Sequence, residues 1–315
     1  MSQHVIVGAG PVGSATAVQL AERGESVAMV TRSGSGPAHA GIQLIAADAT
    51  DPDKLTALTK GADALYNCAN PQYHRWLTDW PPLASSLLTA AERSGAVLVT
   101  AAPLYGYGPG SGVMGPDTPL AATHPKLRMR ADMWREALRR HRDGRIRATE
   151  VRGSDYIEGN GILSWSLGAP LLAGKRAYAP VPINVPHTWT SIHDVARTLV
   201  TVSGDERAYG KAWMVPSHEP LTVAQFAAEF AEANGLARPK VSHLPYAALW
   251  TAGLFDPMVK ELRTTHYQFA KPFLVDASAT EATFGIKARP LDESMREAAA
   301  NVRAAEAAKA TEPKK

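Results

Sequence analysis

The sequence predicts an α/β protein with a Rossmann-type, doubly wound parallel sheet and a smaller, mixed C-terminal region that would bind substrate. Two observations carry this prediction. The first thirty-two residues have the pattern strand, glycine turn, helix, strand, and apolar runs alternate with helical stretches up to about residue 152. Such alternation is typical of parallel sheets, because each parallel connection has to cross one face of the sheet.

The opening segment has the pattern of a dinucleotide-binding turn. An apolar run, His4 to Val7, leads into the glycine motif Gly8-Ala9-Gly10-Pro11-Val12-Gly13, and a helix is expected over Ser14 to Arg23. In this motif the first glycine permits a tight turn, the second lets the backbone approach a pyrophosphate, and the third lets the helix pack closely on the strand. The helix N-terminus then offers N–H groups to the phosphates. We therefore predict cofactor contacts from Gly8, Gly10, Pro11, Val12 and Gly13.

The residues after the second strand indicate which dinucleotide fits. That strand is expected over Val27 to Val30 and is followed by Thr31 and Arg32. A carboxylate at this place would bind a ribose 2′-hydroxyl, whereas a guanidinium suits a 2′-phosphate through charge-assisted hydrogen bonds. Arg32 therefore favours NADP(H) over NAD(H). The alternative is a solvated surface arginine.

Further strands and helices extend the predicted sheet. Because ligands bind outside the carboxyl ends of parallel strands, the loops that follow these strands should line one crevice. Strands are expected over residues 41–46, 64–67, 96–101 and 147–152, with helices over 53–59 and 83–94. Residues 1–152 would form the cofactor domain, with 191–204 packing back on it, and 153–315 the substrate-binding region with a closing helix over 291–308.

Composition places the chain among ordinary globular proteins. It has 315 residues, 45% hydrophobic and 20% charged, with a net charge of +3. The single cysteine, Cys68, excludes an internal disulfide and a cysteine metal cluster. With neither a basic and apolar leader nor a stretch of about 18 apolar residues, the prediction is a cytoplasmic protein. The Arg-rich stretch 135–147 is better explained as a solvated helix end than as a nucleic-acid surface.

Several short motifs follow the strands in a characteristic order. They are Asp48 in Ala-Asp-Ala-Thr-Asp, Asn67-Cys68-Ala69, Leu104-Tyr105-Gly106, Val151-Arg152-Gly153 before Gly159-Asn160-Gly161, and Ser191-Ile192-His193-Asp194-Val195-Ala196. In this order the chain resembles the extended short-chain dehydrogenase/reductase family, the NAD(P)-dependent epimerase/dehydratase-like proteins. The resemblance implies that Asp48 contacts adenine and that Asn67 and Ala69 line the cofactor cleft. As an alternative, Asp48 caps the next helix.

The sequence departs from this family at the catalytic pair. The family's reductases use Tyr-x-x-x-Lys on a helix with a Ser or Thr at the end of the fifth strand, and the lysine lowers the pKa of the tyrosine. Alignment on Pro125 puts Lys126 at the tyrosine position and Arg130 at the lysine position, while Thr100 lies next to the hydroxyl position. The chain therefore resembles the atypical branch of the family.

Other residues are candidates for proton transfer. Tyr105 is the preferred donor, with Tyr107, Tyr156 and, less favoured, His124 as alternatives, and Thr100 would orient a substrate carbonyl. A packed Tyr105 whose hydroxyl meets water is an equally weighted interpretation. Lys126 would need a strongly lowered pKa to act, and Arg130 would bind the nicotinamide ribose. Tryptophans in segments that face the predicted crevice suggest an apolar or aromatic substrate: Trp76, Trp80, Trp165 and Trp189.

The leading functional hypothesis is an NADP(H)-dependent oxidoreductase that acts on a small carbonyl or alcohol. One alternative is a nucleotide-binding sensor without redox turnover, and another is a nucleotide-sugar epimerase or dehydratase. A flavoprotein monooxygenase is opposed by Thr31 and Arg32, which stand where an acid would bind the FAD ribose. The expected partner is a small-molecule substrate, with a homodimer left open and neither nucleic acid nor membrane expected.

Overall fold

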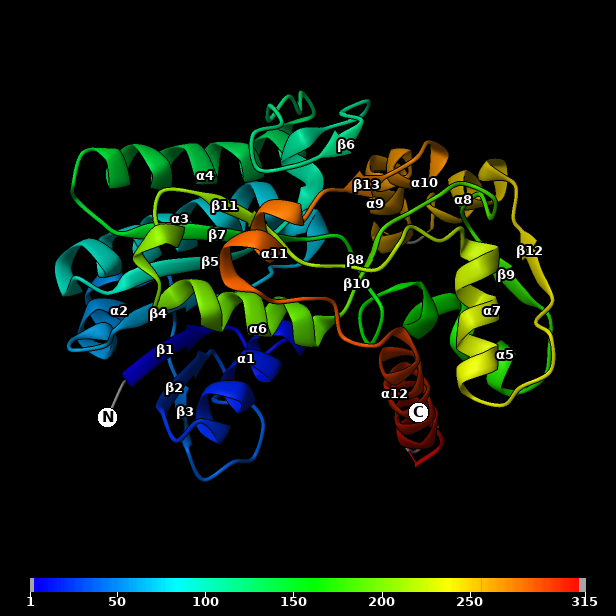
Figure 1. Cartoon of the computed structure of the whole chain (residues 1–315), viewed down its shortest axis with the longest axis horizontal. Helices are drawn as coiled ribbons and strands as arrows, with labels where there is room; N and C mark the ends of the chain where they lie inside the picture. The colour runs from blue at the N-terminus through cyan, green and yellow to red at the C-terminus, as the bar shows by residue number, and fades with distance from the viewer. Residues whose placement is uncertain (1–2, 256, 312–315) are drawn as a thin grey trace. The chain divides into compact units, whose positions relative to one another are not determined.

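The computed structural model describes residues 3–255 and 257–311 (Figure 1). Within them the chain divides into two compact units, and each is described by itself. The first unit comprises residues up to 153, 193–215 and 277–286, and the second comprises 154–192, 216–276 and the residues from 287 onward. Residues 205–215 and 277–286 therefore group with the first unit, although the sequence analysis assigned them to the second region.

The first unit is built on a seven-stranded sheet with the order β11-β7-β5-β4-β1-β2-β3. Every neighbouring pair is parallel. From β1 the chain runs to β2 and β3 on one side and to β4 and β5 on the other, which is the doubly wound arrangement, so the predicted fold class is confirmed. The strands are β1 (Gln3–Val7), β2 (Ser26–Thr31), β3 (Ile42–Ala46), β4 (Ala64–Asn67), β5 (Val97–Pro103), β7 (Ala148–Gly153) and β11 (Ala212–Met214).

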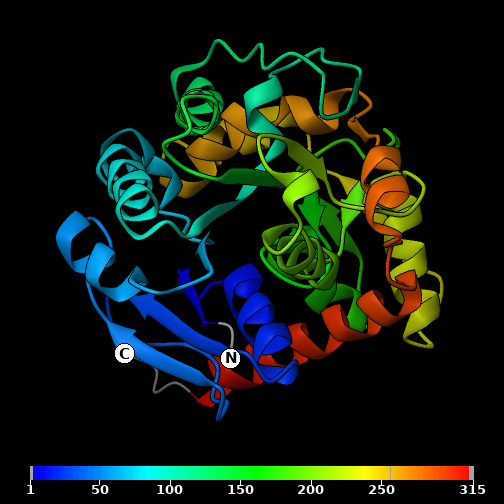
Figure 2. The ribbon, with the colours of Figure 1, turned by 60° about the vertical axis from the view of Figure 1, so that its left-hand side comes forward.

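Helices cover both faces of this sheet. Figure 2 shows α3 and α4 on one face and α1 and α6 on the other. The α1 and α6 helices are joined by a hydrogen bond of 3.1 Å from Gln19 Nε2 to the carbonyl oxygen of His193. The helices of the unit are α1 (Pro11–Glu22), α2 (Pro52–Thr59), α3 (Trp76–Ser94), α4 (Pro125–Arg142), α6 (Ile192–Ser203) and α11 (Ser278–Phe284).

Two helices begin earlier than the sequence analysis expected. Helix α1 begins at Pro11 rather than Ser14, since proline has the backbone angle of a first helical residue and needs no N–H there. Helix α3 begins at Trp76 rather than Leu83 and contains Pro81 and Pro82. Proline is disfavoured inside a helix, but the apolar side chains of α3 recur every three or four residues and are buried. Burial of that face outweighs the prolines.

The second unit has a separate apolar core. Helix α7 (Val223–Ala233) packs against α12 (Leu291–Thr311), and Trp189 stacks on Phe226 with ring centroids 4.0 Å apart. Helix α7 starts with a capping box in which Thr222 and Gln225 exchange hydrogen bonds. The other main elements are β8 (Asp155–Tyr156), α5 (Gly168–Leu172), β9 (Ala177–Ala179), β10 (Trp189–Thr190), β12 (Val241–His243), α8 (Tyr246–Ala252), α9 (Pro257–Thr265) and α10 (Tyr267–Ala270). No helix in the described residues is long and apolar enough to cross a membrane.

Candidate nucleotide and catalytic site

The glycine turn has one crowded side and one open side. Gly8 has φ +102°, and a Cβ there would lie 2.7 Å from the Cα of Ala69. A Cβ on Gly13 would lie 2.0 Å from the carbonyl oxygen of Gly8. At Gly10, by contrast, a Cβ would meet no atom within 4 Å, and Gly10 is the N-cap of α1. The turn therefore leaves space at the positive end of a helix, which fits the pyrophosphate of a dinucleotide.

The residues after β2 form a compact polar turn. The backbone N–H of Ser35 donates to Thr31 Oγ1 at 2.9 Å, and the hydroxyls of Ser33 and Ser35 are 2.9 Å apart. Arg32 is exposed within this turn. An exposed guanidinium flanked by two serine hydroxyls is a donor set that suits a phosphate.

Asp48 follows β3 and is held ionised. Its Oδ1 accepts hydrogen bonds from the backbone N–H and the hydroxyl of Thr50, at 2.9 and 2.8 Å. These bonds hold the pKa of the Asp48 carboxyl below its usual value, and the charge of Arg32 lowers it further. Asp51, not Asp48, caps helix α2 by accepting from the backbone N–H groups of Asp53 and Lys54. Asp48 is thus left as an exposed carboxylate near Arg32.

The segment after β4 packs under the glycine turn. Cys68 is buried, and its Cβ would lie 3.1 Å from a Cβ on Gly13. Burial raises the pKa of the Cys68 thiol to about 12, although a hydrogen bond with Thr16 acts in the opposite direction. The thiol is therefore protonated at neutral pH and serves as a small packing group.

Cys68 gives a test of this packing. We expect the folded protein to react with a thiol reagent such as iodoacetamide at least about 100-fold more slowly than the urea-unfolded chain at pH 8, because only the thiolate attacks. Stability should fall above about pH 9 as the unfolded thiol ionises and the folded one does not. Mass spectrometry of alkylation against urea concentration measures the first effect. Equal rates in the two states would contradict the burial.

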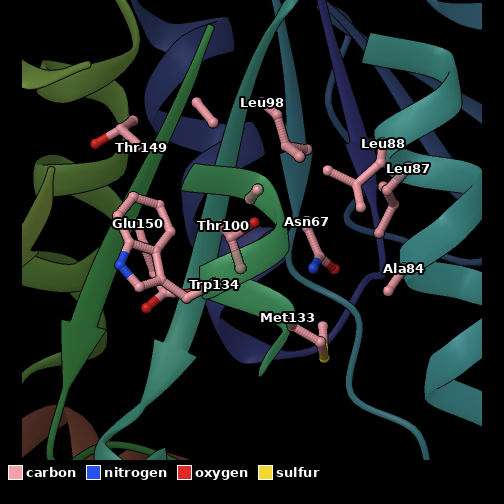
Figure 3. Close-up of a pocket in the computed structure, with 12 residues that line it drawn as sticks. Asn67, Ala84, Leu87, Leu88, Leu98, Thr100, Met133, Trp134, Thr149 and Glu150 are labelled. Atoms are coloured by element: carbon pink, nitrogen blue, oxygen red, sulfur yellow. The ribbon is translucent and has the colours of Figure 1, made fainter. Parts of the chain in front are cut away.

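Polar side chains from three neighbouring strands meet beneath helices α3 and α4. In register, Asn67 of β4 lies beside Thr100 of β5, which lies beside Glu150 of β7. Figure 3 shows these side chains around a small cavity whose other walls include Met133 and Trp134 of α4. The cavity volume is about 20 Å³, enough for one water molecule. Asn67 is 2% exposed, and its Oδ1 is a buried acceptor that a water in this cavity would satisfy.

Tyr105 belongs to a cluster of aromatic side chains. It lies in the short helix η2 (Leu104–Tyr107), directly after β5, and is 9% exposed. Its hydroxyl oxygen is 2.5 Å from the hydroxyl oxygen of Tyr73, which comes from η1 (Tyr73–Arg75) after β4. The ring of Tyr73 stacks on Trp76 with centroids 4.6 Å apart. The sequence analysis did not single out Tyr73, since nothing local marks a tyrosine whose partner is 32 residues away.

Arg130 and Lys126 have different surroundings on α4. Arg130 is 6% exposed, its Cζ lies 4.3 Å from the ring centroid of Trp80, and its Nη2 donates to the carbonyl oxygen of Ala101 at 3.4 Å. Lys126 is half-buried in the first turn of the helix, and His124 is exposed just before it. Arg130 therefore packs against Trp80 and binds the backbone of β5 at Ala101. Lys126, one turn earlier in α4, is only half-buried.

The tryptophan expectation needs correction. Trp76, Trp80 and Trp189 are each 3% exposed or less and belong to the cores of their units, while Trp165 is 47% exposed. Buried indoles cannot contact substrate without repacking. They therefore give no support to an apolar or aromatic substrate. Tyr156 lies in β8 of the second unit, where its backbone pairs with Thr190.

A buried ion pair lies beside the cavity, and the sequence analysis missed it. Arg152 is 2% exposed; its Nε donates to Glu150 Oε1 at 2.7 Å and its Nη1 to the Tyr107 hydroxyl at 2.6 Å. Tyr107 in turn donates to the carbonyl oxygen of Gly115 at 2.7 Å, which ties down the loop that follows η2. Burial raises the pKa of Tyr107, so Tyr107 is a structural hydroxyl. The sequence did carry a signal for this pair, because Glu150 and Arg152 stand two positions apart in a strand and so point to the same face of the sheet.

Comparison with known proteins agrees with this geometry. Residues 8–132 match a family model described as NAD(P)H-binding. The fold is similar to that of the Bordetella bronchiseptica enzyme WbmH in complex with NAD+, at 19% identity and a TM-score of 0.72, covering 96% of this chain and 98% of that one. No curated protein matches the sequence.

Two further solved structures are similar over nearly the whole chain. One is dTDP-glucose 4,6-dehydratase from Bacillus anthracis in complex with NAD, at 14% identity and a TM-score of 0.76, with 98% of each chain covered. The other is UDP-glucuronic acid 4-epimerase from Bacillus cereus in complex with UDP-glucuronic acid and NAD, at 14% identity and a TM-score of 0.75, covering 96% of this chain and 99% of that one. Residues 8–132 thus match an NAD(P)H-binding family model, and the Rossmann fold expected from the sequence is confirmed.

Proposed function

We propose that this chain, whose motifs resemble those of the extended short-chain dehydrogenase/reductase family and whose residues 8–132 match an NAD(P)H-binding family model, transfers hydride between NADP(H) and a small carbonyl or alcohol. The observation that carries the proposal is the open space at Gly10 before the start of α1, beside the crowded Gly8 and Gly13. Gly10 is also the N-cap of α1, and a helix N-terminus that the backbone leaves open suits the close approach of a pyrophosphate.

The catalytic residues in this proposal lie in β5 and directly after it. When bound, the nicotinamide supplies or accepts the hydride. The hydroxyl of Tyr105 donates a proton to the substrate oxygen in reduction and takes it back in oxidation, and Thr100, in the middle of β5, orients that oxygen. Arg130 holds the end of β5 through the carbonyl oxygen of Ala101.

An Arg32→Ala variant tests the choice of cofactor. Arg32 is exposed beside Ser33 and Ser35, so it is available to a 2′-phosphate. We expect the variant to bind NADPH about 10- to 100-fold more weakly, the effect of losing charge-assisted hydrogen bonds. NADH affinity should stay within about twofold, and titration of cofactor fluorescence measures both. Equal losses for the two cofactors, or no loss, would contradict the 2′-phosphate assignment.

The reaction itself is tested by NADPH oxidation across a panel of aldehydes and ketones. Turnover that a Tyr105→Phe variant lacks supports the proposal. Tight NADPH binding without oxidation of any compound would instead support a nucleotide-binding sensor. Absence of NADPH and NADH binding would overturn both.

A second candidate is epimerisation or dehydration of a nucleotide sugar. It is favoured by the likeness, over 96% or more of this chain, to structures of a dTDP-glucose dehydratase and a UDP-glucuronic acid epimerase. Incubation with UDP-glucose, UDP-glucuronic acid or dTDP-glucose and NAD+, followed by NMR of the sugar, tests this candidate. An unchanged sugar in every mixture would exclude these substrates.

A further inference from the structure

We propose that Tyr73 positions Tyr105, so that a hydrogen-bonded tyrosine pair takes the place of the tyrosine–lysine pair that helix α4 lacks. The inference rests on the proposed function, because it assigns a role to Tyr73 through Tyr105 as proton donor. The two hydroxyl oxygens are 2.5 Å apart, at the short end of O–H···O hydrogen bonds. They come from turns that follow the neighbouring strands β4 and β5.

Aromatic packing holds both tyrosines in place. The ring of Tyr73 stacks on Trp76 at an interplanar angle of 18°, and Trp76 Nε1 donates to the carbonyl oxygen of Pro71 at 2.8 Å. The ring centroid of Tyr105 lies 5.8 Å from that of Trp76 and 6.2 Å from that of Tyr73. Trp76 is 1% exposed. The position of each hydroxyl is therefore set by packing against the buried ring of Trp76, which distinguishes this pair from a chance contact of surface side chains.

The pair suits the chemistry of proton donation. A phenol hydroxyl carries one proton and can also accept hydrogen bonds. Tyr105 can thus give its proton to the substrate oxygen, as hydride reaches the substrate carbon, while it accepts the hydrogen bond of Tyr73. The O–H bond of Tyr105 breaks and leaves a phenolate, and the Tyr73 hydroxyl then donates to a charged oxygen, which strengthens the bond. The phenolate regains a proton from water through Tyr73, which is half-buried.

A Tyr73→Phe variant tests the role, with Tyr66→Phe as the matched control. Tyr66 is a buried tyrosine of β4 whose hydroxyl donates to Ser203 Oγ at 2.8 Å, so its loss costs a comparable hydrogen bond outside the pair. We expect Tyr73→Phe to lower kcat for carbonyl reduction at least about tenfold, the effect expected of a charge-assisted bond. KM and NADPH affinity should stay within about twofold, as should every value for Tyr66→Phe.

A second readout needs no turnover. In protein carrying 13Cζ-labelled tyrosine, with the Tyr105 signal assigned by Tyr105→Phe, that signal should titrate at higher pH in Tyr73→Phe than in the wild type and be unchanged in Tyr66→Phe. An unchanged titration together with wild-type kcat would overturn the role of Tyr73 and leave the proposed function standing. If the wild type reduces no carbonyl, the proposed function fails, and an unchanged titration would then also overturn the pair.

Discussion

A Gly10→Ala variant is expected to lose about 100-fold or more in NADP(H) affinity, the effect of displacing two or so hydrogen bonds to phosphate. Its free energy of unfolding should stay within about 1 kcal/mol of the wild type, the usual range for a change of N-cap. Gly10 has φ −69°, which alanine adopts freely, and its Cβ would meet no protein atom within 4 Å. The methyl group would occupy only the space that the pyrophosphate needs.

The neighbouring Gly13→Ala variant should fail for a different reason. Its Cβ would lie 2.0 Å from the carbonyl oxygen of Gly8, so α1 has to move away from β1, at a cost of about 3 kcal/mol. Urea unfolding and cofactor titration of both variants separate a lost binding site from a strained fold. Gly204→Ala is the control, because a Cβ there also meets nothing within 4 Å. It measures the effect of a glycine-to-alanine change away from the glycine turn. Unaltered cofactor affinity in Gly10→Ala would contradict the placement of the pyrophosphate.

The glycine turn at the start of α1 could be predicted from sequence, because the residues that form it are close together in the chain. The glycine turn and the alternating strands and helices each depend on residues within a few positions of one another, so spacing alone predicts them. The error in α3 had a local cause too. The predicted start at residue 83 lies directly after Pro81 and Pro82, which are disfavoured inside a helix, yet the buried apolar face begins at Trp76.

The surroundings of the candidate catalytic residues could not be predicted in the same way. Tyr73 and Tyr105 meet only because the register of β4 and β5 brings the turns that follow them together. Arg130 lies on the helix after Pro125, as expected, but its burial against Trp80 depends on how α3 packs against α4. Single-sequence patterns carry no information on such long-range pairs, so Tyr105 was identified as a candidate without its partner.

Removal of the carboxylate from the buried ion pair is expected to have the largest effect on stability. A Glu150→Leu variant leaves the Arg152 guanidinium, which is 2% exposed, without its counter-charge. An uncompensated buried charge costs about 3–5 kcal/mol. The Tyr107 hydroxyl accepts from Arg152 at 2.6 Å but carries no charge at neutral pH, so it cannot take the place of Glu150. Urea unfolding followed by circular dichroism measures the loss.

Two further variants separate loss of charge from loss of packing. Removing both charges in Glu150→Leu/Arg152→Met should restore most of the lost stability, because the buried charge is gone and the volume is largely kept. Arg93→Ala, in a pair whose side chains are 52% and 86% exposed, should change stability by about 0.5 kcal/mol or less. If the double variant is as unstable as Glu150→Leu, the carboxylate acts through the cavity that it shares with Asn67 and Thr100 rather than through Arg152. Glu150 would then stabilise the fold through its polar contacts with the neighbouring strands, and not by neutralising the charge of Arg152.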